Sequence, residues 1–312
     1  MSLFFKSPID IEILLDGEES RKHVEIANSS NNPTARTLKD RYPVYEDGES
    51  VSGIVTLRVK EGKKLEHLGV KVSLIGSVDI TKSTSEGKKR PVETFLTLSA
   101  DLCPHGELVH SQNFPFNFKD VEKRYEAYRG KNVDVTYYVK VTVFRKSTDI
   151  VKHKRFWCLL YHPDPTPPTV ANPSDERKPV KLDIGIENCL HIEFEYSKSQ
   201  FSLKDVIVGR IYFLLTRLKV KHMELSVITR ETCGMEPVQL LDSTSIRYEI
   251  MDGSPVKGET IPIRLFLGGY DLTPSSTFNF FNIKNYLSLV IIDEDGRRYF
   301  KQSEITLYRK RN

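Results

Sequence analysis

VDVTYYVKVTV (residues 133–143) is the stretch that decides the fold, because apolar and polar side chains alternate along it. A β-strand directs successive side chains to opposite faces of its sheet, so this period of two predicts a strand with one buried face. The same alternation recurs elsewhere, at residues 9–13, 70–74, 190–196 and 261–265. The sequence therefore predicts an all-β protein made of antiparallel strands.

Helical periodicity is scarce, and its best example lies at residues 121–128 (VEKRYEAY). Val121, Tyr125 and Tyr128 recur there at positions i, i+4 and i+7, and Gly130 follows. Glycine often ends a helix, so the pattern predicts a short helix. An ordered loop that is anchored by its two tyrosines explains the same residues equally well.

The two halves of the chain resemble each other. The corresponding segments are VSGIV at 51–55 and IVGRI at 207–211, then LEHLGVKV at 65–72 and VKHMELSV at 220–227. Gly53 and Gly209 lie 156 residues apart, and His67 and His222 lie 155 apart. A repeat this long indicates a duplicated domain, so we expect two tandem immunoglobulin-like β-sandwiches. The repetition also predicts a structural hydrogen-bonding role for both histidines.

Prolines mark the boundary between the halves. Residues 163–179 (PDPTPPTVANPSDERKP) hold six prolines in seventeen positions. Proline lacks a backbone donor and cannot continue a central strand, which predicts an extended connector. We expect an N-terminal sandwich at 1–162, a linker at 163–180 and a C-terminal sandwich at 181–312. A second polar stretch, 18–40, predicts a long surface loop or a partly disordered insertion.

Composition and charge exclude several classes of protein. The chain has 46 Lys and Arg against 42 Asp and Glu, and a net charge of +4 is small for a nucleic-acid-binding domain. No apolar run approaches the ~18–20 residues that span a bilayer. The first residues turn polar after two phenylalanines, which does not fit a signal peptide. Four separated cysteines (Cys103, Cys158, Cys189 and Cys233) favour free thiols in the reducing cytosol.

No motif of a familiar enzyme class is present. The sequence contains neither a GxxxxGK[ST] phosphate loop nor a GxSxG nucleophile elbow. Cys189, His191, Glu193 and Glu195 share one face of a predicted strand and could offer metal ligands. A solvated sheet face is the simpler interpretation of that spacing. We therefore expect no catalytic residue, no metal site and no cofactor.

A candidate partner-binding tip lies near residue 250. Ile250 and Met251 directly precede the turn signal Asp252-Gly253-Ser254-Pro255. If this is a hairpin tip, two large apolar side chains lie near solvent, where such groups often anchor a partner. The alternative is that both residues end a strand and pack downward.

Long stretches of the chain also resemble a known family. YEDGESVSGIVTLRV (45–59), GIENCLHIEFEYSKSQFSLKDVIVGRIYFLLTRLKVKHMELSVI (185–228) and YEIMDGSPVKGETIPIRLFLGGYDLTP (248–274) are similar to the arrestin-like subunits of retromer, the vacuolar protein sorting-associated protein 26 family. The resemblance covers nearly the whole chain. It implies an arrestin fold without enzymatic activity, in a complex that sorts transmembrane cargo out of endosomes.

The resemblance implies a contact with a helical partner. In the family, the C-terminal sandwich binds the N-terminal end of a long α-solenoid, vacuolar protein sorting-associated protein 35. The loop that matches this contact holds Ile250, Met251, Asp252 and Gly253. The implied membrane association is indirect, on the cytosolic face of endosomes, and no nucleic acid is expected.

The resemblance also implies a groove for cargo tails, completed by a sorting nexin with a phox domain. The matching positions are Ile184 and Phe300, and cargo would pair there with a strand edge. Two other assignments remain open: the arrestin-like subunit of the related retriever complex, and a direct arrestin-type receptor adaptor.

Overall fold

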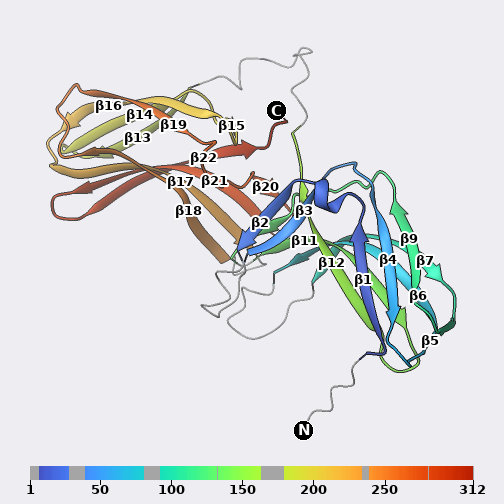
Figure 1. Cartoon of the computed structure of the whole chain (residues 1–312). Helices are drawn as coiled ribbons and strands as arrows, with labels where there is room; N and C mark the ends of the chain where they lie inside the picture. Colours follow the sequence, from blue (N-terminus) through green and yellow to red (C-terminus); the bar gives the residue numbers. More distant parts are fainter. Residues whose placement is uncertain are drawn as a thin grey trace, which may run out of the picture. The chain divides into compact units, whose positions relative to one another are not determined.

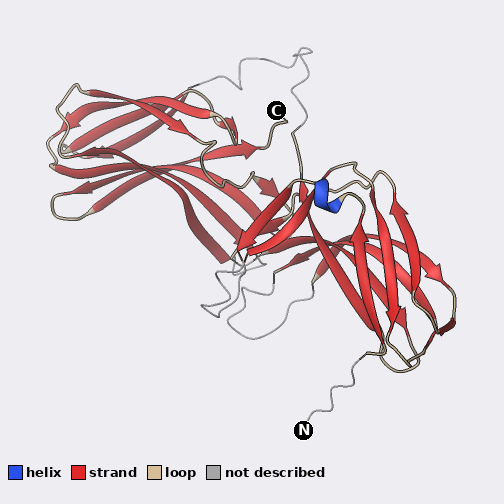
Figure 2. Ribbon diagram, viewed as in Figure 1, coloured by secondary structure: helices blue, strands red, loops and turns tan. Residues whose placement is uncertain are grey.

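The computed structural model describes residues 7–27, 39–80, 92–131, 133–162, 179–233, 239–279 and 281–311. The chain divides into two units, residues 1–160 and residues 161–312. Each is built from strands, and the helical structure in the described ranges is one short 3₁₀ turn, η1 (Glu18–Ser20) (Figure 2). The all-β prediction is confirmed.

Unit 1 contains the strands β1 to β12 (Figure 1). Their bounds are β1 (Ile9–Leu15), β2 (His23–Ala27), β3 (Lys39–Glu46), β4 (Val51–Val59), β5 (Leu65–His67), β6 (Gly69–Asp79), β7 (Glu93–Cys103), β8 (Gly106–Leu108), β9 (Gln112–Phe118), β10 (Tyr128–Arg129), β11 (Asp134–Phe144) and β12 (Ile150–Leu159). One sheet has the order β1-β4-β9, and the facing sheet has the order β2-β3-β12-β11-β6-β7. Strands β5 and β8 form a separate pair, and β10 pairs with β11.

Unit 2 contains the strands β13 to β22. Their bounds are β13 (Val180–Ile186), β14 (Leu190–Tyr196), β15 (Gln200–Ser202), β16 (Val206–Thr216), β17 (Val220–Cys233), β18 (Gln239–Asp252), β19 (Thr260–Phe266), β20 (Ser276–Thr277), β21 (Phe281–Asp293) and β22 (Arg298–Tyr308). One sheet has the order β13-β14-β16-β19 and the other the order β15-β22-β21-β17-β18, with β20 on β21.

The two units share one topology. Strand β4 lies between β1 and β9, as β16 lies between β14 and β19. The order β12-β11-β6-β7 corresponds to β22-β21-β17-β18. The last strand of each unit also pairs in parallel with an early strand, β12 with β3 and β22 with β15. The predicted duplication is confirmed, and the fold is a pair of arrestin-like β-sandwiches.

The core of each unit lies between its two sheets. In β11, every second residue is buried, as the alternation at 133–143 predicts. Val139 and Val141 of this strand have no exposed surface. Burying one such side chain stabilises the fold by roughly 1.5–3 kcal/mol, so the alternating strands supply much of the driving force.

The glycine of the repeated motif has the same structural role in both units, which is to allow close approach of a neighbouring strand. A Cβ atom on Gly53 would overlap the carbonyl oxygen of Leu14 in the neighbouring strand β1. A Cβ atom on Gly209 would lie 2.5 Å from the carbonyl oxygen of Glu195 in β14. The repeated glycine therefore lets two strands approach where no side chain fits.

The two repeated histidines differ in their surroundings. His67 is buried, and its Nδ1 has no hydrogen-bond partner among the described residues. His222 is half-buried, with Nε2 3.6 Å from a carboxylate oxygen of Glu224 and Nδ1 3.6 Å from one of Glu249. The shared hydrogen-bonding role that the repetition predicts is therefore wrong.

The prediction of a surface loop at 18–40 is wrong at both ends. Strand β2 pairs with β3 in an antiparallel hairpin, and β3 continues into the parallel pair with β12. The polar composition predicted a loop because a short strand near a sheet edge can leave most of its side chains in solvent and therefore lacks an apolar pattern. Residues 28–38 of the stretch lie outside the described residues.

Residues 121–127 form an ordered loop and not a helix. Tyr137 Oη donates a hydrogen bond to the carbonyl oxygen of Tyr125 (2.7 Å) and accepts one from its N–H (3.2 Å). The buried Lys123 donates from Nζ to three backbone carbonyl oxygens 2.7–3.2 Å away. Lys123 and Tyr137 thereby satisfy backbone groups of Val121 and Tyr125, which a helix would pair internally. The ordered loop is confirmed, although the tyrosine side chain that holds its backbone is that of Tyr137 in β11.

The predicted linker, 163–180, falls mostly outside the described residues. Its last residue, Val180, begins β13. All four cysteines are described, and each is a free thiol, as predicted.

Candidate partner-binding surfaces

The predicted tip ends the long strand β18. Met251 lies opposite Met223 of β17, but Glu249 lies opposite Glu224, so Ile250 is an extra residue in a β-bulge. A bulge bends its strand and re-aims the side chains beside it. Ile250 and Met251 are both half-buried and pack against the core of unit 2. Of the two alternatives that the sequence left open, the second is confirmed: Ile250 and Met251 end a strand and pack on the core, although neither is fully buried.

The turn after this strand is held by hydrogen bonds. Gly253 has a φ of 104°, and its N–H donates to the carbonyl oxygen of Lys221 (2.8 Å). Ser254 Oγ donates to the carbonyl oxygen of Val220 (2.9 Å). Val256 projects from the turn with 71% of its surface exposed. The sequence patterns did not single out Val256, although an apolar residue within a turn of glycine, proline and lysine is itself a signal.

Charged groups flank these apolar side chains. Asp252 is exposed, and Glu249 is exposed beside His222. Arg247 Nε lies 3.5 Å from the buried carboxylate of Glu224. An apolar centre with a charged rim is the usual anatomy of a protein–protein interface. We call Ile250, Met251, Asp252, Gly253 and Val256 the β18 tip.

The residues predicted for a cargo groove lie on two neighbouring strands. Strand β13 contacts β22, and it is an edge strand that pairs with β14 alone among the described strands. Phe300 on β22 is 60% exposed, whereas Ile184 on β13 is 7% exposed and belongs to the core. The structure therefore brings the two strands together, but it directs the two side chains into different surroundings.

Comparison with known proteins places the chain in a family. The model of the family "Vacuolar protein sorting-associated protein 26" matches residues 5–296. The chain belongs to the Vps26 family. Carboxypeptidase Y-deficient protein 8 of Saccharomyces cerevisiae is 57% identical over 379 aligned residues, which cover 100% of each chain. Vacuolar protein sorting-associated protein 26 of Schizosaccharomyces pombe is 45% identical over 315 residues, covering 100% of this chain and 99% of the relative.

A human relative gives the same assignment. Vacuolar protein sorting-associated protein 26B of Homo sapiens is 45% identical over 315 residues, covering 99% of this chain and 88% of its own. Vps26 proteins are protein-sorting subunits and not enzymes. The chain therefore has a role in vacuolar and endosomal protein sorting.

The strand face on which Cys189, His191, Glu193 and Glu195 could offer metal ligands carries ion pairs. Lys181 Nζ lies 2.6 Å from a carboxylate oxygen of Glu193 and 3.6 Å from one of Glu195. His191 Nε2 lies 2.8 Å from Asp183 Oδ1. Across the described ranges, no group of three or more His, Cys, Asp or Glu residues could hold a metal ion. Membership of the Vps26 family, whose members are protein-sorting subunits, contradicts the metalloenzyme alternative.

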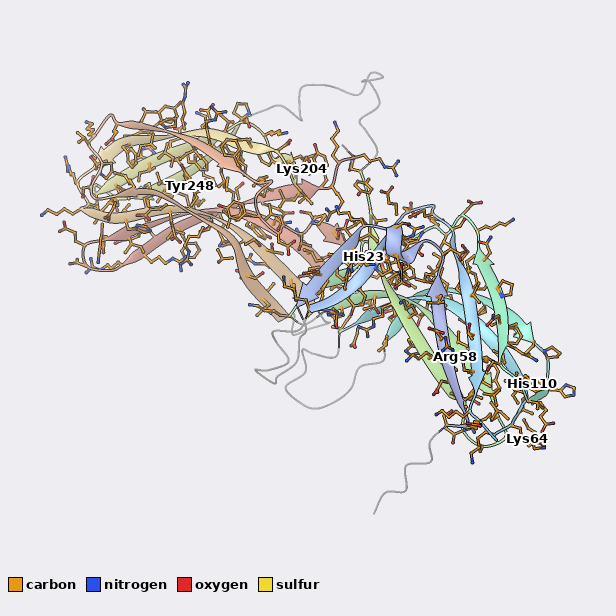
Figure 3. The ribbon with its side chains drawn as sticks, viewed as in Figure 1. His23, Arg58, Lys64, His110, Lys204 and Tyr248 are labelled. Carbon is orange, nitrogen blue, oxygen red and sulfur yellow. The ribbon has the colours of Figure 1, made fainter. Side chains whose placement is uncertain are left out.

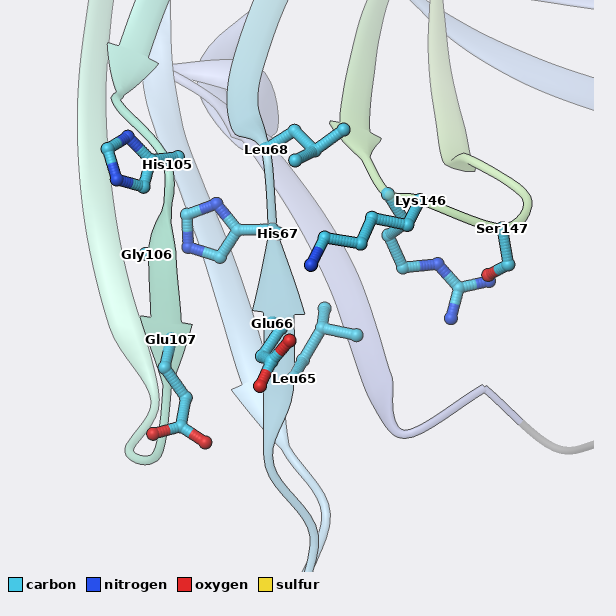
Figure 4. Close-up of a pocket in the computed structure, with 10 residues that line it drawn as sticks. Leu65, Glu66, His67, Leu68, His105, Gly106, Glu107, Lys146 and Ser147 are labelled. Atoms are coloured by element: carbon cyan, nitrogen blue, oxygen red, sulfur yellow. The ribbon is translucent and has the colours of Figure 1, made fainter.

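Unit 1 also has a depression of about 440 Å³ beside the buried His67 (Figure 4). The ring of His67 turns toward Gly106 and His105, while Lys146 lies on the opposite side. Burial and the neighbouring His105 lower the pKa of His67, which favours its neutral form.

No helical segment in the described part of the chain could span a membrane.

Proposed function

We propose that this chain is the arrestin-like subunit of the retromer core and that the β18 tip binds the N-terminal end of vacuolar protein sorting-associated protein 35. The observation that carries this proposal is the bulge at Ile250. It holds two large apolar side chains half-buried next to a hydrogen-bonded turn that exposes Val256. Preorganised apolar groups lose little conformational entropy on binding, which favours tight association.

The test is calorimetric titration of the full chain into the N-terminal part of the solenoid. We expect tight binding by the wild type and a loss of at least ~100-fold in the double variant Ile250→Asp, Met251→Asn, because such anchors dominate interface energy. Leu240→Asp is the matched control, since Leu240 lies at the other end of β18 and is 63% exposed. It should bind as the wild type does.

Because Ile250 and Met251 also pack on the core, thermal unfolding must show that the double variant is folded. Val256→Asp gives a second test, since this exposed side chain can change without disturbing the core. Unchanged affinity in both variants would move the interface elsewhere. No binding by the wild type would contradict the retromer assignment, and the retriever solenoid would be titrated next.

The second part of the proposal is a cargo groove at the open edge of β13, on the cytosolic face of endosomal membranes. Three features support β-augmentation by a cargo tail, completed by a sorting nexin: the edge of β13 that no described strand covers, the adjacent β22 and the exposed Phe300. The buried Ile184 would contribute through its backbone and as the floor of a side-chain pocket.

Phe300→Ala tests this groove, in a binding assay of a cargo-tail peptide with this chain, the solenoid and a phox-domain sorting nexin. We expect a loss of at least ~10-fold, the size expected for an exposed aromatic anchor. Phe266→Ala on β19 is the control. Phe266 is 59% exposed, and β19 forms the edge opposite β13 in the sheet β13-β14-β16-β19. Equal losses in both variants would contradict a groove at β13.

A further inference from the structure

Strand β7 forms one margin of the large sheet of unit 1, and β9 forms the margin of the small sheet beside it (Figure 1). Among the described strands, β7 pairs with β6 alone and β9 with β4 alone. The core of the sandwich therefore meets solvent between β7 and β9 unless side chains cover it. We call the core-facing residues Leu96, Leu98 and Ala100 of β7 and Phe114 of β9 the β7–β9 flank.

The strand register places the β7 residues of the flank on the core side. Leu98 lies opposite Leu74 and Ala100 lies opposite Val72, and neither Leu74 nor Val72 has exposed surface. Leu98 is nevertheless 37% exposed, Ala100 is exposed, and Leu96 is half-buried. Core-facing apolar side chains that remain in solvent form a patch of the kind that marks an interaction site.

The patch continues beyond β7. Phe114 of β9 lies opposite Val55, which has no exposed surface, and Phe114 itself is half-buried. Val109, in the connection between β7 and β9, is exposed. His110 follows Val109, is labelled in Figure 3 and marks this end of the flank. The exposed apolar surface therefore extends across both margins.

The corresponding strand of unit 2 covers its core. Strand β18 corresponds to β7, and its Ile246 lies opposite Val227, as Ala100 lies opposite Val72. Ile246 is 1% exposed. Tyr248 lies two residues further along the same face of β18 and is labelled in Figure 3. Unit 2 thus fills with large side chains the position at which unit 1 has alanine.

Both margins of the flank disfavour pairing with a further strand. The register between β7 and β6 shifts twice, so Phe95 and Leu102 are extra residues in β-bulges. Pro115 in β9 has no N–H to donate. Bulges and prolines at sheet edges hinder the addition of another strand. The flank therefore offers apolar side chains without a regular row of backbone groups.

An α-helix suits such a surface. Its backbone groups bond within the helix, and an amphipathic helix presents apolar side chains along one stripe. Between the two bulges, β7 runs from Leu96 to Asp101. At ~3.3 Å per residue this stretch is about 20 Å long, which matches about thirteen residues of helix at ~1.5 Å each.

The unpaired charge beside the flank is negative. Glu93 lies opposite the buried Val78, on the same side of β7 as Leu98. It is exposed, and no described residue forms an ion pair with it. The other carboxylate of β7 belongs to Asp101, which lies 3.7 Å from Lys71 Nζ. A helix that carries a basic residue near one end therefore complements the charge of the flank.

We propose that the β7–β9 flank binds an amphipathic helix of a partner protein, about thirteen residues long, with its apolar stripe on Leu96, Leu98 and Phe114. A basic residue of the helix lies near Glu93. The helix covers the core side that β7 leaves open, as Ile246 does in unit 2. This site lies in unit 1 and is independent of the β18 tip and of β13, so it does not rest on the proposed retromer function.

The probe is a capped 15-residue peptide with leucines at i, i+3, i+4 and i+7 and with Ala and Lys at its other positions. It is titrated into the full chain with ¹³C-labelled methyl groups on Leu and Ala, so that Leu96, Leu98 and Ala100 report directly. We expect the signals of these three residues to shift and that of Leu240 in unit 2 to stay unchanged. The same peptide with its central Ala replaced by proline should bind at least ~10-fold more weakly, because proline breaks the helix.

Variants of β7 test the surface itself. Leu98→Lys should weaken binding at least ~10-fold, because it places a charge in the apolar contact. Thr97→Lys is the matched control, since Thr97 is exposed and points to the opposite face of the same strand. It should bind as the wild type does. Ala100→Arg, at an exposed position of the flank, should also weaken binding and serves as the second test if thermal unfolding shows that Leu98→Lys is not folded.

The charge of the occupant is tested at the end of the flank. Glu93→Lys should weaken binding of the lysine peptide about 10-fold and strengthen binding of a peptide with Glu in place of Lys, as expected for charges that select a partner. Unchanged affinities for both peptides would contradict the basic residue in the proposed helix.

Several outcomes would overturn the proposal. The first is the absence of binding at millimolar peptide, and the second is equal affinity in the wild type, Leu98→Lys and Ala100→Arg. Equal binding of the proline peptide would mean that the flank does not select a helix. Broadening of the Leu96 and Leu98 signals that grows with protein concentration before any peptide is added would assign the flank to a second copy of the chain. Titration of the solenoid into the same preparation would show separately whether the proposed retromer function holds.

Discussion

The two sandwiches are copies in topology and differ at their edges and in their polar interiors. Both keep the glycine where two strands approach, and both pair their last strand in parallel with an early one. Unit 2 has an additional strand, β13, beside β14, whereas the corresponding edge of β1 is open in the described structure. The comparison shows that duplication preserved backbone packing while strand edges and loops diverged.

The interiors differ as well. Unit 1 encloses the ammonium group of Lys123 in a cage of backbone carbonyl oxygens. Unit 2 instead buries a side-chain network, in which Thr229 Oγ1 donates to Asn285 Oδ1 (2.9 Å). Asn285 Nδ2 in turn donates to the carbonyl oxygen of Thr273 (3.0 Å). Each solution satisfies buried polar groups that would otherwise be costly.

The largest expected effect tests the shared glycine. Gly53→Ala and Gly209→Ala should each destabilise their own unit by about 3 kcal/mol or more, because the new Cβ meets backbone that cannot move alone. Differential scanning calorimetry and amide exchange would locate the loss. Gly185→Ala is the control, since a Cβ there meets nothing within 4 Å, and it should change stability by less than about 0.5 kcal/mol. If either substitution left the stability of its own unit unchanged, the two glycines would not be equivalent.

The second prediction tests whether the buried Lys123 stabilises unit 1 alone. Lys123→Met keeps the length of the side chain but leaves the carbonyl oxygens of Glu46, Glu49 and Val121 without this donor. Unit 1 should lose about 2–3 kcal/mol, and amide protection in unit 2 should stay unchanged. Lys119→Met, at an exposed position in the same unit, is the matched control. Equal losses in both variants would mean that the carbonyl cage does not stabilise unit 1.

A smaller effect concerns pH and the divergent histidines. Burial and His105 lower the pKa of His67 below its unfolded value of ~6.5. The unfolded chain then binds more protons, so the stability of unit 1 is fully present above pH ~6.5 and falls as the pH drops. His67→Leu should flatten this dependence in urea unfolding followed at several pH values. His110→Gln, at an exposed position, should leave the pH dependence of stability unchanged. If this variant flattened it as much as His67→Leu does, the dependence would not arise from His67.

The smallest effect belongs to unit 2. Arg230 binds Asp242 across β17 and β18 through two hydrogen bonds of 2.6 and 2.8 Å, which lower the pKa of Asp242. Because the carboxylate is partly exposed, Asp242→Asn should cost only about 0.5–1 kcal/mol. The contribution is present above pH ~4 and is lost as the pH falls and Asp242 is protonated. Urea unfolding at pH 7 and pH 3 would check it, and an equal difference between wild type and variant at both values would contradict it.

The sequence by itself determined the strands, the duplication and the family. Alternation at 133–143 predicts a strand because a period of two follows directly from strand geometry, and β11 occupies that stretch. The spacing of Gly53 and Gly209 predicts two related units because a duplicated backbone contact needs glycine twice. Long stretches of similarity to the Vps26 family carry the role in protein sorting, and no local pattern of residues could have supplied it.

Only the tertiary structure decided how single side chains are used. Ile250 and Met251 are half-buried because a bulge, which depends on the pairing of β17 with β18, re-aims them. Lys123 reads as a surface residue in the sequence, yet it is buried because three carbonyl oxygens converge on it from separate segments. The open edge of β1 exists because β1 pairs on one side alone within the described strands. The burial of a side chain, the register of a strand pair and the position of a sheet edge all depend on which distant strands pair. A local sequence pattern does not predict that pairing.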